Sequence, residues 1–283
     1  MKKQVKDFIS QYDTETEDML FLVEKGCFGA TIKEKYCLPC VRFIASYSPK
    51  TGELSQEPGY LDWIVKDNHL RSGWGHHFRS LGVYRIRVSR FLSADSSEES
   101  PLLAARGGNR FRIVRILRRS VKCSLFDKVR EHYLTPVTIE SPVYGSFTLD
   151  RSNDIFKSEI SFGASEIALE LTTDVPYGET ADKALEALHR LYSDLPAVDE
   201  RLKKYAAEID TEHANDWNAD EEPEKQHEIT AEEFAKRMTL CMVSIENDGS
   251  ASFWYDDDDM FFGHVIVIEV DSSGTPSEPK LMG

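Results

Sequence analysis

Short apolar segments with strand-like composition dominate the first half of the chain. The first residues are an exception, because the apolar side chains of Val5, Phe8, Ile9 and Tyr12 follow helical spacing. From Cys27 onward, β-branched and aromatic residues gather in short segments separated by clusters of Gly, Pro, Ser and Asn. This pattern predicts a mainly-β domain, either a small barrel or a curled sheet. The expected strands are Cys27–Ile32, Cys40–Tyr47, Tyr60–Val65, Val83–Phe91 and Phe111–Ile116.

The alternation of apolar and basic residues between positions 83 and 90 predicts which side chains face the core of this domain. Successive side chains of a strand point to opposite faces, so the apolar set and the arginines cannot share a face. We expect Tyr84, Ile86 and Val88 to point inward, and Arg85 and Arg87 to point outward.

The second half alternates strands and helices in blocks. Three strand-like segments come first, two amphipathic helices and a capped helix at Thr230–Met238 follow, and three more strands close the chain. Blocks of strands, helices and strands predict an α+β domain of order βββ-ααα-βββ, with the helices on one side of a largely antiparallel sheet. The expected strands are Tyr144–Arg151, Phe156–Phe162, Glu166–Thr172, Leu240–Asn247, Ser250–Tyr255 and Val265–Val270.

Charge divides the chain at the same place as the pattern does. Residues 1–140 hold 23 Lys and Arg against 17 Asp and Glu, a net charge of +6, whereas residues 141–283 hold 11 against 32, a net charge of −21. With 283 residues, two domains are the default expectation. We therefore expect a net basic mainly-β domain at 1–140 and a strongly acidic α+β domain at 141–283.

The cysteines and the hydropathy pattern predict a cytoplasmic protein. Five cysteines spread over a long chain argue against a disulfide framework. The sequence has no apolar run long enough to span a membrane, and its N-terminus lacks the apolar stretch of a secretory signal. We expect no membrane association.

Two groups of residues in the first half could carry chemistry. Arg85, Arg87, Arg112 and Arg115 alternate with aromatic residues on predicted strands, which suits nucleic-acid binding or contact with the acidic domain. The spacing of Cys37 and Cys40 suits a metal clamp or a redox pair. No second cysteine pair or histidine pair completes a metal site, so we favour free cysteines and expect neither a metal nor a cofactor.

The second half offers one candidate functional surface, made of Asp256, Asp257, Asp258, Asp259, His264 and Trp217. Clustered carboxylates could bind a divalent cation, but the regular spacing of a calcium loop is absent. A solvated acidic loop is the simpler interpretation, with His264 hydrogen-bonded in the core. Because neighbouring carboxylates repel, we expect a counter-charge from His264, from an arginine of the first half or from a partner.

Several spaced motifs of the second half resemble a known family. They are Gly145-x-Phe147-x-Leu149-Asp150-Arg151, Phe156, Asn215-x-Trp217, Thr230–Phe234, Asp248-Gly249, Asp258-Asp259-Met260-Phe261-x-Gly263-His264 and Leu281–Gly283. In this order they resemble the bacterial family called domain of unknown function 2262, over about residues 142–283. One departure is Ile160-Ser161-Phe162, which lacks the Trp expected in that strand. The resemblance implies a bacterial, cytoplasmic protein and assigns no activity or catalytic residue.

Three functions fit these patterns. We favour a non-catalytic binding protein, of the kind that neutralises a toxin, which docks a basic partner through its acidic domain. A second hypothesis is a metal-dependent or acid–base enzyme with its site at Asp256–Asp259 and His264. A third is a nucleic-acid adaptor that uses the arginines of the first domain.

Overall fold

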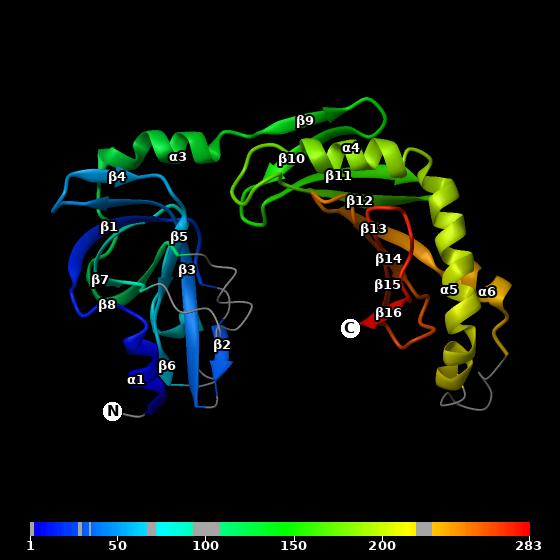
Figure 1. Cartoon of the computed structure of the whole chain (residues 1–283), viewed down its shortest axis with the longest axis horizontal. Coiled ribbons are helices and arrows are strands. Elements are labelled where there is room, and N and C mark those ends of the chain that lie inside the picture. Colours follow the sequence, from blue (N-terminus) through cyan, green and yellow to red (C-terminus); the bar gives the residue numbers. More distant parts are fainter. Residues whose placement is uncertain (1–2, 28–29, 34, 67–71, 93–107, 219–227) are drawn as a thin grey trace. The chain divides into compact units, whose positions relative to one another are not determined.

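The computed structural model describes residues 3–27, 30–33, 35–66, 72–92, 108–218 and 228–283, which form two compact units (Figure 1). The units are Met1–Thr135 and Pro136–Gly283. Both contain helices and strands, so the α+β prediction is confirmed. The boundary expected at residue 140 falls inside β9 (Thr138–Ser141), which pairs with β10 (Gly145–Asp150) and so belongs to the second unit.

The N-terminal unit is a five-stranded barrel. Its strands are hydrogen-bonded in the order β1-β7-β8-β5-β3, and β3 pairs with β1 to close the ring. The prediction of a mainly-β domain is confirmed, and of its two expected forms, a small barrel or a curled sheet, the structure has the barrel. The ring strands are β1 (Glu17–Val23), β3 (Tyr36–Ser48), β5 (Gly59–Asp62), β7 (Val83–Arg90) and β8 (Arg110–Arg118), while β2 (Ala30–Lys33), β4 (Glu53–Ser55) and β6 (Val65–Lys66) pair with β3.

The connectivity of the ring is that of an oligonucleotide- and oligosaccharide-binding barrel. Numbered along the chain, the five strands close in the order 1-2-3-5-4, and the pair β5–β8 is parallel while the others are antiparallel. Barrels of this class bind ligands on the face of their second and third strands. Fold alone does not assign this function, so the residues on that face decide it.

The barrel interior is filled by aromatic rings from three strands. Phe21, Phe43 and Phe111 are buried, with ring centroids 5.0, 5.5 and 5.9 Å apart in their three pairs. Beside them, Gly59 allows β5 to approach β8 closely, because a Cβ at this position would lie 2.1 Å from the carbonyl oxygen of Asn109. Arg85 and Arg87 are exposed while Tyr84, Ile86 and Val88 are buried, as the alternation predicts.

A buried polar network covers the outer side of β5. The Asp62 carboxylate accepts a hydrogen bond from the Tyr12 hydroxyl (2.8 Å) and pairs with Nε of Arg110 (3.1 Å). The Arg110 guanidinium also lies 4.0 Å from the ring centroid of Phe91. Burial, followed by the charge of Asp62, raises the pKa of Tyr12. Helix α1 (Lys3–Ser10) packs beside this network through Phe8. The network fills part of the face that barrels with this connectivity use for ligands.

Two helical segments follow the barrel in the N-terminal unit. The short helix η2 (Ser124–Phe126) leads into α3 (Asp127–Leu134), and their residues Phe126 and Val129 cover Leu22, Ile44 and Val83. Another short helix, η1 (Ser72–Gly75), connects the third and fourth strands of the ring.

The C-terminal unit is one eight-stranded sheet with the order β16-β15-β14-β13-β12-β11-β10-β9. Every neighbouring pair is antiparallel except β12–β13, which the intervening helices join as a parallel pair. The predicted order βββ-ααα-βββ gains a short strand at each end. The remaining strands are β11 (Ile155–Phe162), β12 (Ser165–Thr172), β13 (Thr239–Ile245), β14 (Ala251–Asp256), β15 (Val265–Val270) and β16 (Lys280–Met282).

Three helices lie along one side of this sheet, as predicted (Figure 1). They are α4 (Asp182–Leu191), α5 (Leu195–Asn218) and α6 (Ala231–Arg237). The apolar sides of α4, α5 and α6 contribute Leu188, Leu202 and Phe234 to one core with the inward residues of the strands. The predicted cap of α6 is present, because the Thr230 side chain accepts a hydrogen bond from the Glu233 amide.

Among the described residues, no helix has both the length and the apolar character needed to cross a bilayer.

The buried ion pair predicts a sharp difference between two aspartates of the barrel. Asp62→Ala removes the carboxylate that pairs with the buried charge of Arg110, which costs about 3–5 kcal/mol of unfolding free energy. Asp18 pairs with Arg87 on the exposed surface, so Asp18→Ala should change stability far less. Urea denaturation of both variants measures the difference, and equal losses would contradict the structural role of the Asp62–Arg110 pair.

Candidate functional site

The Asp256–Asp259 run and the residues after it form two consecutive tight turns between β14 and β15. The residues Asp258 and Asp259 have φ of 47° and 61°, and the Met260 amide donates to the Asp257 carbonyl at 3.1 Å. The same pattern repeats at Phe262 and Gly263, with φ of 54° and 83°, where the His264 amide donates to the Phe261 carbonyl at 3.3 Å. Positive φ at both central residues is the signature of a type I′ turn. We call residues 256–264 the double turn.

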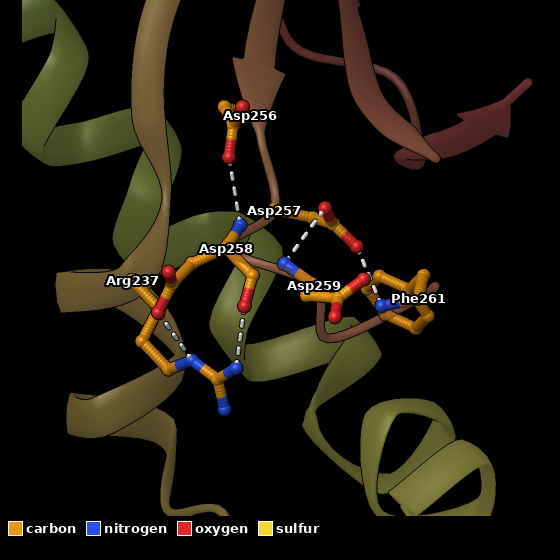
Figure 2. Close-up of polar contacts among 6 residues, drawn as sticks. All are labelled: Arg237, Asp256, Asp257, Asp258, Asp259 and Phe261. Atoms are coloured by element: carbon orange, nitrogen blue, oxygen red, sulfur yellow. Dashed lines mark hydrogen bonds and ion pairs between the residues drawn. The ribbon is translucent and has the colours of Figure 1, made fainter. Parts of the chain in front are cut away.

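Two of the four carboxylates hold the double turn together. Asp257 is only 2% exposed, and its two oxygens accept hydrogen bonds from the amides of Asp259 (3.1 Å) and Phe261 (2.5 Å). The Asp256 carboxylate accepts the Asp258 amide at 2.9 Å (Figure 2). Asp257 is therefore not part of an exposed surface, contrary to expectation, because the turn amides require its oxygens inside.

The counter-charge for the acidic run comes from Arg237, at the end of α6. Its Nε lies 3.1 Å from Oδ2 of Asp258, and its Nη2 donates to the Asp258 carbonyl at 2.7 Å (Figure 2). Sequence reasoning missed Arg237, which is 21 residues before Asp258. The acidic run also affects β13, where partial burial and then the charge of Asp256 raise the pKa of the Cys241 thiol.

The other two predicted residues are also in contact, because Trp217 packs against His264, the last residue of the double turn. Their ring centroids are 5.3 Å apart, and Trp217 also contacts Phe261 and Phe262 at 5.6 and 5.4 Å. The Trp217 Nε1 donates to Nε2 of His213 at 3.0 Å, and Nδ1 of His264 lies 2.5 Å from the Phe261 carbonyl oxygen. This arrangement agrees with a hydrogen-bonded His264 that supports the turn.

Phe262 is the residue of this site that sequence reasoning overlooked. Its side chain is 46% exposed, although it contacts Trp217 on one side. Its φ of 54° lies in the left-handed region, where a bulky side chain is rare and each residue costs about 1–2 kcal/mol. The signal available in the sequence was the dipeptide Phe262-Gly263, because glycine commonly follows in such turns.

A metal site would need several side chains to converge, and the described contacts separate them instead. Asp256 and Asp257 bind turn amides, Asp258 binds Arg237, and His264 binds a backbone carbonyl. Within the described ranges, no three His, Cys, Asp or Glu side chains gather so that they could hold a metal ion. The described contacts of Asp256, Asp257 and Asp258 are therefore structural ones within and beside the turn.

Cys37 and Cys40 lie three positions apart on β3, so their side chains point to opposite faces of the strand. Cys37 is fully buried and Cys40 is half-buried, and neither forms a disulfide bond. This arrangement does not favour the metal clamp or the redox pair that the spacing alone suggests.

The predicted arginines lie on the outer side of the β7–β8 pair. Arg87 is directly opposite Arg115, and Arg85 is opposite Arg118. Arg112 lies opposite Ser89 and is only half exposed, and burial lowers the pKa of its guanidinium.

Comparisons with known families agree with the division of the chain. Residues 141–281 match the family described as "Uncharacterized protein conserved in bacteria (DUF2262)". The C-terminal half of the chain belongs to this family. Residues 4–133 match a second family, "Domain of unknown function (DUF7021)". Neither a search of curated proteins nor a search of solved structures gave a significant match.

The role of Asp257 can be tested against a neighbour with the same side chain. Asp257→Asn replaces one accepting oxygen by a donor that faces a turn amide, so the loss of unfolding free energy should be about 1–3 kcal/mol. The matched control is Asp259→Asn, because the Asp259 side chain is exposed and should tolerate the change. Thermal unfolding distinguishes the two variants, and equal stability would show that the turn does not depend on Asp257.

The left-handed backbone at residue 262 predicts that a glycine variant is more stable than an alanine variant, which is the reverse of the usual order. Both substitutions remove the ring, but only glycine relieves the positive φ, so Phe262→Gly should be more stable than Phe262→Ala by about 1 kcal/mol. At a residue with negative φ, alanine is the more stable of the two. Chemical denaturation of both variants gives the sign, and a more stable alanine variant would exclude the double turn.

Proposed function

We propose that this protein is a non-catalytic interaction protein of the bacterial cytoplasm, which docks a basic protein partner through its double turn. The five cysteines form no disulfide bond with one another, which suits a reducing compartment. A toxin with a basic nuclease active site is a partner of the required chemistry, and its neutralisation is the role that we propose for the docking.

The exposed ring of Phe262 is the observation that carries this proposal. Strained backbone clusters at sites where the strain serves binding or catalysis. Here the strain presents an aromatic side chain to solvent from a turn that Asp257 and Arg237 hold in place. A rigid aromatic anchor loses little conformational entropy on binding, which is the property of a residue that dominates an interface.

Charge around the anchor defines the partner. The carboxylates of Asp256, Asp258 and Asp259 are exposed in the same turn, and the C-terminal half carries a net charge of −21. A surface of this sign attracts a basic protein over the Debye length and repels acidic ones. We therefore expect the anchor to enter an apolar pocket that basic residues surround.

Site-specific photo-crosslinking tests this function in a bacterium that carries the full chain. A photoreactive phenylalanine analogue at position 262 keeps an aromatic ring at the anchor and should give a discrete adduct with a basic protein. The adduct should weaken when Asp258 and Asp259 are changed to Asn, because the attraction is electrostatic. The same analogue at Val175 is the control, since Val175 is 57% exposed and lies near the opposite end of β14.

Mass spectrometry of the adducts separates the outcomes. A basic protein captured at position 262 and not at position 175 supports the proposal. Identical products from both positions, no adduct at position 262, or an acidic protein as the captured partner would each contradict it.

A further inference from the structure

The outer face of the β7–β8 pair carries four arginines in two cross-strand pairs. Arg85 is opposite Arg118, and Arg87 is opposite Arg115, and all four side chains are exposed. Like charges directly opposite each other destabilise a sheet. Repulsion within these pairs lowers the stability of the free barrel, and an anion bound between the arginines would neutralise the repulsion.

One carboxylate partly neutralises this face. Asp18 of β1 binds Arg87 through both oxygens, at 2.7 and 3.2 Å, and lies 3.5 Å from Arg85. Within the part of the chain that the structure describes, Arg115 and Arg118 pair with no carboxylate. The face therefore keeps a net positive charge, and two of its guanidinium groups can bind an external anion. We call these four arginines the arginine face.

We propose that the arginine face binds the phosphate backbone of a single-stranded nucleic acid. Alternate residues such as Arg85 and Arg87 lie about 6.7 Å apart along a strand, and opposite residues lie about 5 Å apart. A register shift between Arg85 and Ile86 places Arg118, three residues after Arg115, opposite Arg85. This spacing resembles that between successive phosphates of one strand. Each guanidinium can bind a phosphate through two parallel hydrogen bonds. Carboxylates scattered on a protein surface would not have the spacing of the arginines.

The shape of the face favours a single strand over a duplex. A β-sheet twists, and a flexible backbone can follow the twist while a rigid duplex touches it only along a tangent. The aromatic residues Tyr84 and Phe111 of these strands are buried in the barrel, so they offer no ring on which a base could stack. Binding should therefore depend on phosphates and show little sequence preference.

This surface differs from the ligand face of other barrels with the same connectivity. That face contains β3 and β5, and here Tyr12, Asp62 and Arg110 fill part of it. The acidic character of the whole chain does not oppose the proposal, because charges are screened beyond about 8 Å at physiological salt. The local charge of the arginine face decides the interaction.

Fluorescence anisotropy of a labelled oligothymidylate with the full chain tests this proposal. The affinity should fall with salt, with a log–log slope of about −2 to −3, since each neutralised phosphate of a single strand contributes about −0.7. The double variant Arg115→Gln, Arg118→Gln should reduce the slope by about 1.4. Its melting temperature should be equal or higher, because the repulsion is removed, and this confirms that the variant is folded.

Two further variants make the result specific. Asp18→Asn removes the neutralising carboxylate, so it should bind the oligonucleotide more tightly than the natural protein. Lys66→Gln removes an exposed positive charge from β6 of the same unit and should leave the slope unchanged.

Four results would overturn the proposal. They are no binding at low salt, an unchanged slope in the double arginine variant, equal or tighter binding of polyglutamate, and tighter binding of a duplex of the same length. Polyglutamate binding would indicate an acidic protein partner for the arginine face. These results leave the double turn untouched, so they are independent of the proposed docking function.

Discussion

The buried carboxylate of Asp257 is the constraint on which the proposed site depends. It satisfies two amides that would otherwise lack partners inside the double turn, and it does so from a position that is almost inaccessible to water. Because these amides are held, the backbone can form two successive turns whose central residues have positive φ. The second turn exposes the ring of Phe262 to solvent. Arg237 then attaches the same turn to helix α6, so the position of the anchor is set by the helical layer as well as by the sheet.

Local patterns predicted the parts of the fold that depend on local chemistry. The alternation at residues 83–90 placed Arg85 and Arg87 outside the barrel, and the Thr230 cap of α6 was evident from the spacing of Thr and Glu. Ring closure could not be predicted in this way, because the β1–β3 pairing and the parallel β5–β8 pairing join distant segments. The short strands β9 and β16 were missed for a similar reason, since each takes its strand form from one neighbour.

In the candidate site too, local sequence predicts only part of the structure, and contacts between distant segments decide the rest. Four consecutive aspartates are equivalent by composition, yet Asp257 is buried against two amides, Asp258 binds an arginine, and Asp256 accepts a turn amide from an exposed position. Only the path of the backbone distinguishes them. Each of the two proposed surfaces contains a locally unfavourable feature in a fold that is otherwise stable. In the C-terminal unit it is the positive φ of Phe262, and in the N-terminal unit it is the pairs of facing arginines. Departures of this kind are where function is expected.

We infer that the double turn is ordered in the free protein and presents its anchor before any partner binds. Amide hydrogen exchange of the full chain measures this order directly, residue by residue. We expect the amides of Asp259 and Phe261 to be protected at a level close to that of the flanking strands β14 and β15, because both donate to the buried Asp257. Exchange of these two amides at the rate of an open loop would contradict it.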